Sequence, residues 1–281
     1  MNCNKDSLPL YRQVPFDLEH LLHRCLEEAA AKVQKGTSVI VFFRADDIGV
    51  PGETFAKLVD LFRRKQVPLT LSVVPAWLTR PRWQQLQDLC GKDRRLWCWT
   101  QHGWRHVNHQ PRGKKLEFGP GRPASRKRQD LCLGFQRLSE LMGELFVPAF
   151  TPPWNRCDQE TLAALQGLGY RALSRSLGAQ PPAPATVTEY PVSVDLHTRK
   201  EQDAGHGWQN LCGELRNNLA NGFCGVMVHH QRMNYGAFVF LDLLLDKLKQ
   251  WHCGRLVHLG TLLEEGYKPQ EVGSSQIHRL I

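Results

Sequence analysis

The sequence predicts an α/β fold in which parallel strands and helices alternate along one chain. Apolar, β-branched runs such as Ser38–Phe43 are followed by amphipathic helical segments such as Pro51–Lys65. The strand-like runs are continuously apolar, which is typical of strands buried on both faces of a parallel sheet. About seven or eight such units fit in 281 residues, and this favours a closed or partly closed barrel over an open sheet.

The elements follow one another in a regular order. The first helix, Phe16–Val33, keeps apolar residues at helical spacing and ends before Gly36. The helix Pro51–Lys65 begins with a proline suited to a first turn, and Asp158 is a suitable N-cap for a later helix. The remaining strands are expected at Leu69–Val74, Leu96–Thr100, a segment ending near Phe150, Arg171–Ser174, Tyr190–Asp195, Phe223–Val228 and Leu256–His258, and the remaining helices at Pro81–Leu89, Ser125–Leu145, Asp158–Leu168, Trp208–Ala220 and Ala237–Trp251.

Composition limits the cellular setting. No run of about 18 apolar residues occurs, so no membrane-spanning helix is expected. The first residues lack the apolar core of a secretory signal. The nine cysteines are scattered, odd in number and without a CxxC pair, which favours a reduced protein over a disulfide scaffold. We therefore expect a cytoplasmic protein; the oligomeric state is not predicted.

The net charge of +9 is concentrated in one segment. Seven basic residues lie in the segment from Arg112 to Arg128, and Glu117 is the only acidic residue of this segment. This segment is either a solvated loop or a docking surface for an anionic substrate. Nucleic acid is the less favoured partner, because Phe118 is the only aromatic residue available there for base stacking.

Candidate metal ligands follow the strands. Asp46 and Asp47 come after the first strand, and His102 and His106 come after the third. In parallel α/β folds the strand ends meet at one face, where reactive residues gather. On a helical turn, His102 and His106 would project from one side and share an ion. One carboxylate and two imidazoles can hold a divalent metal, and the spare carboxylate can take a proton from water.

Other polar residues fall at further strand ends. Pro153 and Trp154 form a stiff segment that is either core or the wall of a substrate pocket. Asp195 ends one predicted strand. His229 and His230 follow another, where two imidazoles without hydrogen-bond partners would be costly to bury.

These residues, in this order, resemble the polysaccharide deacetylase (NodB-like) superfamily, which contains carbohydrate esterase family four. The resemblance covers roughly Ser38 to Gly266 and is carried by FFRADDIG, His-x-x-x-His, Thr151-Pro152-Pro153-Trp154 and the strand ending in His229. It implies a distorted (β/α) barrel with about seven parallel strands. It also implies that Asp46 is the catalytic base, Asp47, His102 and His106 are metal ligands, and His229 is the general acid. Asp195 would orient His229.

The chain departs from the family pattern at several positions, as expected of a divergent branch. Thr151 replaces an arginine that steadies the catalytic aspartate in the family. Arg44 is expected to compensate, because side-chain alternation along a strand places it on the same face as Asp46. Asn155 replaces a glycine, and His230 follows the predicted acid, so either His229 or His230 is the proton donor.

The expected activity is metal-dependent removal of an N-acyl group from a sugar or sugar-like amide. Zinc is the favoured metal, and cobalt, nickel and iron also suit the ligand set. The alternatives are a cytosolic amidase acting on a small molecule and a non-catalytic, metal-containing binding protein. The predicted organisation is an N-terminal arm and helix (1–37), a catalytic domain (38–266) and a C-terminal tail (267–281).

Overall fold

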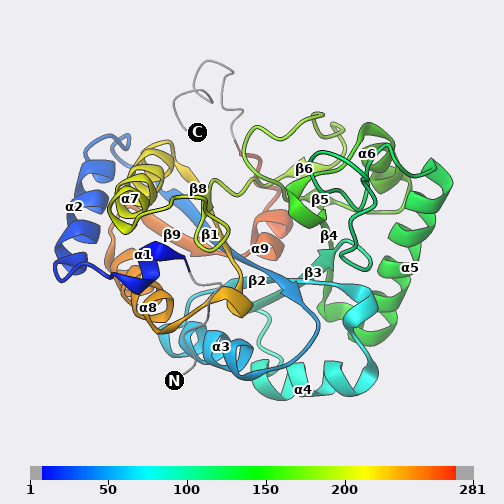
Figure 1. Cartoon of the computed structure of the whole chain (residues 1–281), viewed down its shortest axis with the longest axis horizontal. Coiled ribbons are helices and arrows are strands. Elements are labelled where there is room, and N and C mark those ends of the chain that lie inside the picture. Colours follow the sequence, from blue (N-terminus) through cyan, green and yellow to red (C-terminus); the bar gives the residue numbers. More distant parts are fainter. Residues whose placement is uncertain (1–7, 270–281) are drawn as a thin grey trace.

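A curled parallel sheet lies at the centre of the molecule, with most helices around its outside (Figure 1). The computed structural model describes residues 8–269. Every strand pairing in this range is parallel, and the order is β6-β5-β4-β3-β2-β1-β8-β7, with β9 beside β1. The predicted α/β fold of the distorted-barrel type is confirmed.

The strands are short at the closing edges of the sheet and long at its centre. They are β1 (Val39–Ile48), β2 (Leu69–Val73), β3 (Trp97–His102), β4 (Phe146–Thr151), β5 (Ala172–Leu173), β6 (Thr188–Glu189), β7 (Val194–Asp195), β8 (Phe223–Val228) and β9 (Gly254–Val257). The helices are α1 (Pro9–Arg12), α2 (Leu18–Ala30), α3 (Glu53–Lys65), α4 (Arg80–Cys90), α5 (Ala124–Met142), α6 (Gln159–Gly167), α7 (Ala204–Ala220), α8 (Tyr235–Gln250) and α9 (Leu259–Glu264).

A single extended stretch, residues 188–195, joins the two ends of the sheet. On one side, the Val192 N–H donates to the Arg175 carbonyl beyond β5, at 2.7 Å. On the other side, the Ser193 N–H donates to the Gly225 carbonyl of β8, at 2.8 Å. We predicted one strand at Tyr190–Asp195, but only the ends of the stretch, β6 and β7, have regular strand pairing. This is the point at which the barrel is distorted.

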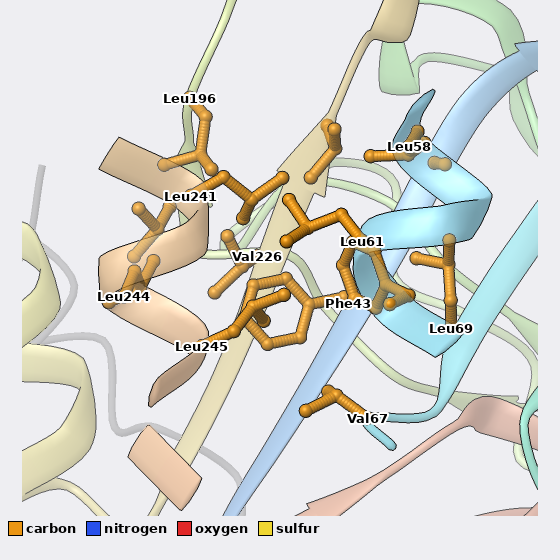
Figure 2. Close-up of a cluster of buried hydrophobic side chains, with 14 of the residues drawn as sticks. Phe43, Leu58, Leu61, Val67, Leu69, Leu196, Val226, Leu241, Leu244 and Leu245 are labelled. Atoms are coloured by element: carbon orange, nitrogen blue, oxygen red, sulfur yellow. The ribbon is translucent and has the colours of Figure 1, made fainter. Parts of the chain in front are cut away.

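Side-chain alternation along β1 separates two cores. Its odd-numbered residues pack outward: Phe43 lies with Val226 of β8 between α3 and α8 (Figure 2). Its even-numbered residues face the barrel interior, where Ile40 and Phe42 form an apolar layer with residues of β3, β4 and β8. Arg44 and Asp46 continue this inner row toward the carboxyl ends of the strands, so the interior changes from apolar to polar along the barrel axis.

Helix α9 closes the apolar end of the barrel. Leu259 and Leu262 belong to the same interior cluster as Ile40, and the N–H of Leu259 donates to the hydroxyl of Thr70 on β2. Neither α9 nor α1 was predicted, because each is a short helix of six or four residues without a full amphipathic repeat.

Most predicted elements are present with shifted ends. The main correction is β1, which was expected to end at Phe43 but continues through Asp46 and Asp47 to Ile48. Similarly, β3 ends at His102 itself. Asp158 caps α6 as predicted, since its Oδ1 accepts from the Thr161 N–H at 2.9 Å.

The division into 1–37, 38–266 and 267–281 stays a prediction, and residues 1–7 and 270–281 lie outside the described part. Within the described part, α1 and α2 pack on α7 and α8; for example, the amide of Asn234 donates to the Tyr11 carbonyl. The eight cysteines in this range are all free thiols. None of the helices between residues 8 and 269 has the length and apolar character needed to cross a membrane.

Candidate active site

An irregularity in the pairing of β1 lets the neighbouring carboxylates of Asp46 and Asp47 line the same cleft. The register between β1 and β2 shifts between Ala45 and Ile48, as at a β-bulge. Within it, Asp47 has a left-handed backbone with φ of 62°, which is uncommon for a residue with a side chain. Neighbouring strand residues normally face opposite sides of a sheet. Here Asp46 and Asp47 both line one cleft, as the bulge allows.

The three predicted metal ligands converge. Oδ1 of Asp47 lies 3.2 Å from Nε2 of His102 and 3.2 Å from Nε2 of His106. One ligand atom from each residue lies within 4.8 Å of the other two. The described residues offer no other group of three such side chains with this geometry.

A hydrogen bond selects the tautomer of His102. Its Nδ1 is 3.0 Å from the carbonyl oxygen of Thr151, which can only accept, so Nδ1 carries the proton. Nε2 is then free to present a lone pair to a metal, and a metal-ligating histidine commonly donates its other N–H in this way. In the neutral imidazole, Nε2 and the Asp47 Oδ1 would be two acceptors facing each other. The pair therefore calls for a positive charge between them, and a divalent ion such as zinc fits this donor set.

The pKa values describe the same electrostatics. Burial raises the pKa of Asp47, but the hydrogen bond and charge of His102, with the charge of His106, bring it well below its ordinary value. Burial lowers the pKa of His102, but Asp47 and Asp46 raise it above its usual range. The pKa of His106 is lowered by burial and by His102. The low pKa of Asp47 and the raised pKa of His102 thus favour a positive charge between these two groups.

The expected helical turn at His102–His106 is wrong. His102 ends β3, and the residues after it form a loop in which Gly103 and His106 have φ of 57° and 59°. The buried carboxylate of Glu117 holds this loop: its oxygens accept from the N–H groups of Trp104 at 3.2 Å and Arg105 at 2.7 Å. Burial raises the pKa of Glu117, against the effect of these N–H groups. A loop anchored by a carboxylate, not a helix, brings the two imidazoles together.

Arg44 steadies Asp46, as side-chain alternation predicted. Its Nε donates to Oδ1 and its Nη2 to Oδ2 of Asp46, both at 2.8 Å, in a fully buried pair. Arg44 also donates to Ser174 and to Oδ1 of Asn155. Burial raises the pKa of Asp46, but Arg44 and His102 lower it below its ordinary value. Asp46 is therefore an ionised carboxylate at neutral pH.

Thr151 and Asn155 have local explanations. The Thr151 side chain points to the hydroxyl of Ser72, at 3.3 Å, and not to Asp46. Asn155 has φ of 58°, a conformation that asparagine tolerates better than most residues with a side chain. Its side chain also accepts a hydrogen bond from Arg44.

The structure separates the two neighbouring histidines. His229 is half-buried and lines the cleft, whereas His230 is 3% exposed and packs against the ring of Phe55, outside the cleft lining. Burial lowers the pKa of His230 to about 4, so it is neutral at pH 7. The backbone N–H of His229 donates to Nδ1 of His197, a buried histidine that the sequence reasoning missed.

Asp195 does not orient His229. Its carboxylate accepts from the backbone N–H groups of His197 and Thr198 and from the hydroxyl of Thr198. No hydrogen bond between Asp195 and the His229 ring is present among residues 8–269, and Nδ1 of His229 is buried without a partner there. Asp195 instead fixes the turn that carries His197.

Trp154 forms part of the cleft wall, and Pro153 does not. The ring of Trp154 lies 4.6 Å from that of His106 and 6.0 Å from Nζ of Lys115. Its φ of 57° belongs to a tight turn over residues 153–155. Pro153 is buried against Gly103, where an added Cβ would lie 2.6 Å from its Cγ. Pro153 therefore supports the ligand loop and does not contact the cleft.

The cleft has a volume of about 1020 Å³ and contains charges of both signs. It is lined by the cationic Lys115, Arg156, Arg199, Lys200 and Arg232 and by the carboxylates of Asp46, Asp47, Asp195, Glu201 and Glu214. A smaller cavity of about 340 Å³, near Phe223 and Tyr267, contains none of the predicted site residues.

The basic segment between Arg112 and Arg128 is not one docking surface. Only Lys115 among its basic residues lines the cleft. Arg122 pairs with Asp130 at 2.7 Å, and the buried Lys127 pairs with Asp158 and Glu160. The cleft cations Arg156, Lys200 and Arg232 lie outside this segment, at positions that charge counting along the sequence did not identify.

Comparison with known proteins identifies the fold. No protein-family model and no curated protein matches this sequence. Solved structures do match, including a putative polysaccharide deacetylase from Mycobacterium smegmatis, with a TM-score of 0.61, 13% identity and coverage of 83% of this chain and 91% of that one. A family 4 acetyl xylan esterase from Clostridium thermocellum in complex with a cobalt ion gives 0.51, 14%, 82% and 93%.

A CE4 family pseudoenzyme from Bacillus anthracis also matches, with a TM-score of 0.50, 13% identity and coverage of 83% of this chain and 67% of that one. The likeness is one of backbone arrangement, because the sequences have diverged widely. This chain therefore has the fold of the polysaccharide deacetylases, as its motifs predicted.

Proposed function

We propose that this protein is a metal-dependent hydrolase of the polysaccharide deacetylase superfamily that removes an N-acyl group from a sugar-like amide. The observation that carries the proposal is the convergence of Asp47, His102 and His106 beside a second carboxylate, Asp46, in one cleft. A simple metal-storage or structural site has no need of an additional ionised carboxylate at its edge.

The residues divide the work of hydrolysis. Asp47, His102 and His106 would hold the metal, which supplies Lewis acidity toward the acyl carbonyl and lowers the pKa of water. Asp46 accepts the proton of the attacking water, because it is ionised and lines the same cleft. Arg44 occupies one lone pair on each oxygen of Asp46 and fixes the orientation of the carboxylate.

His229 is the proposed proton donor to the departing nitrogen. It lines the cleft with Asp46, and its backbone is held by His197. His230 is unsuitable because it faces Phe55 and has a pKa of about 4. Trp154 lines the cleft next to His106 and offers a flat ring against which a sugar-like substrate would pack.

A non-catalytic role is the main alternative, because one structural neighbour is described as a pseudoenzyme. The presence of both the three metal donors and the Arg44-held base favours catalysis for this chain. A small-molecule amidase remains compatible with the same residues, and it differs in substrate and not in chemistry.

The test compares wild-type protein with Asp46→Asn on N-acetyl and O-acetyl substrates, with metal content measured in parallel. We expect the variant to keep its metal and to lose about a hundredfold or more in kcat, the lower end of a general-base contribution. Asp88→Asn, at an exposed position on α4, is the matched control and should match wild type. Equal kcat in Asp46→Asn removes Asp46 as the base. A metal-loaded wild type that releases no acetate supports the binding-protein alternative.

A further inference from the structure

We infer that the substrate carries an anionic group, a carboxylate or a phosphate, and that Arg156 and Lys115 bind it beside Trp154. This inference rests on the proposed function, and it adds a substrate class that the three metal donors and Asp46 do not specify.

The first observation is that four cations of the cleft have no carboxylate partner. Among residues 8–269, no ion pair involves Lys115, Arg156, Lys200 or Arg232, although all four line the cleft. The fifth cation, Arg199, differs: it is held by Glu214 at 2.7 Å and Glu201 at 2.5 Å. Arg199 is thus neutralised by carboxylates of the protein, and the other four cations of the cleft are not.

Arg156 is the most informative of the four. Arg156 is half-buried, whereas Lys115, Lys200 and Arg232 are exposed. Removing part of a guanidinium from water without a counter-charge is unfavourable. Arginine presents a planar fork of donors that matches the two oxygens of a carboxylate or phosphate. An anionic ligand group would satisfy this fork.

The backbone around Arg156 is well fixed. It follows the turn at residues 153–155, and its N–H donates to the Pro153 carbonyl. Two residues later, the N–H of Asp158 donates to the Phe118 carbonyl at 3.0 Å. Arg156 is therefore anchored on both sides, and little backbone freedom would be lost on binding.

Lys115 comes from a different loop, and its side chain lies near the ring of Trp154. Its Nζ is 6.0 Å from the centroid of the Trp154 ring, and the same ring lies 4.6 Å from His106. Lys115 is thus close to a metal ligand, and Arg156, two residues after Trp154, lines the same cleft. A sugar packed on Trp154 with its acyl group at the metal site would place another substituent near these cations.

The overall charge of the cleft supports an anion. The cationic and carboxylate side chains of its lining are equal in number, and Arg44 stands behind Asp46. A bound divalent ion makes the total positive, so the cleft would attract negatively charged substrates over neutral ones.

The experiment measures binding by calorimetry to zinc-loaded Asp46→Asn, in which turnover is expected to be at least about a hundredfold slower than in wild type. The probes are N-acetylglucosamine, its 6-phosphate, and its 3-O-lactyl ether, which are neutral, phosphorylated and carboxylated. At low ionic strength we expect at least one charged probe to bind ten times or more tighter than the neutral one. This advantage should fall as salt is added.

Two further variants, in the same background, assign the effect to residues. Arg156→Gln should reduce the ratio of charged to neutral affinity tenfold or more. Arg112→Gln removes an equal charge from an exposed residue outside the cleft and should leave the ratio unchanged. Preference for the phosphate alone or the carboxylate alone supports the inference and identifies the group. Equal affinities for all three probes, or a ratio unaffected by Arg156→Gln, overturn it.

Acetate release by wild type separates this inference from the proposed function. Tight binding of a charged probe without release supports the anion site and refutes hydrolysis of that probe. Release from charged and neutral probes with equal kcat/KM supports hydrolysis and refutes the anion site.

Discussion

Replacing Glu117 by glutamine tests whether the ligand loop depends on a buried charge. Glu117 is fully buried, and its two oxygens hold the backbone N–H groups of Trp104 and Arg105, between the ligands His102 and His106. No ion pair to Glu117 is present in the described range. Glutamine keeps the shape but turns one acceptor into a donor, which would face an N–H group.

The size of the effect follows from these two bonds. A hydrogen bond to a charged group contributes about 1.5–3 kcal/mol, and glutamine would lose one and weaken the other. Groups that orient metal ligands typically change metal affinity by about 10–100-fold, which corresponds to about 1.4–2.8 kcal/mol. The two estimates agree, so we expect zinc affinity to fall about 10–100-fold in Glu117→Gln.

The assay is competition for zinc with a chromophoric chelator, together with thermal unfolding of the metal-free protein. Glu144→Gln is the control, because the Glu144 side chain is 95% exposed. Zinc affinity within threefold of wild type in a folded Glu117→Gln protein would refute the idea that this carboxylate positions the loop. A fall in unfolding temperature without any change in zinc affinity would assign Glu117 a structural role alone.

Two more changes test the polar interior. Arg44→Gln leaves Asp46 buried without its counter-charge and should lower the free energy of unfolding by about 3–5 kcal/mol; a urea midpoint and slope equal to wild type would contradict this. His230 has a pKa of about 4 when folded and about 6.5 when unfolded, so the unfolded chain binds more protons between these pH values. The free energy of unfolding is therefore unaffected by protonation of His230 above about pH 6.5, and it falls by about 3 kcal/mol through this residue as the pH drops to 4. In metal-free protein, His230→Gln should flatten the dependence of unfolding free energy on pH in this window, and an unchanged slope would show that His230 is not the source.

The sequence predicted those parts of the site that depend on strand periodicity. Alternation placed Arg44 and Asp46 on one face, and they form a bidentate pair. The motif order also identified three side chains whose ligand atoms the fold brings within 4.8 Å of one another. These features follow from the apolar runs that identify β1 and β3 and from the alternation of side chains along β1.

Local backbone exceptions were not predictable in the same way. The bulge at Asp46 and Asp47 and the positive φ of His106 depend on tertiary contacts, such as those of Glu117 with the ligand loop. Glu117 could have been noticed as the one acid in a basic segment, but charge patterning gives it no partner. The choice between His229 and His230 required the position of Phe55, which comes from a different element.

The pairing of β1 has a consequence for how the chain acquires its fold. This strand has β2 and β9 on one side and β8 on the other, so its pairing needs residues 69–73 and also residues far along the chain, 223–228 and 254–257. During synthesis, the edge of β1 that will receive β8 stays open until residue 228 has been made. Such distant contacts slow folding and leave an unpaired apolar edge exposed in the meantime. We expect a chain truncated before β8 to aggregate.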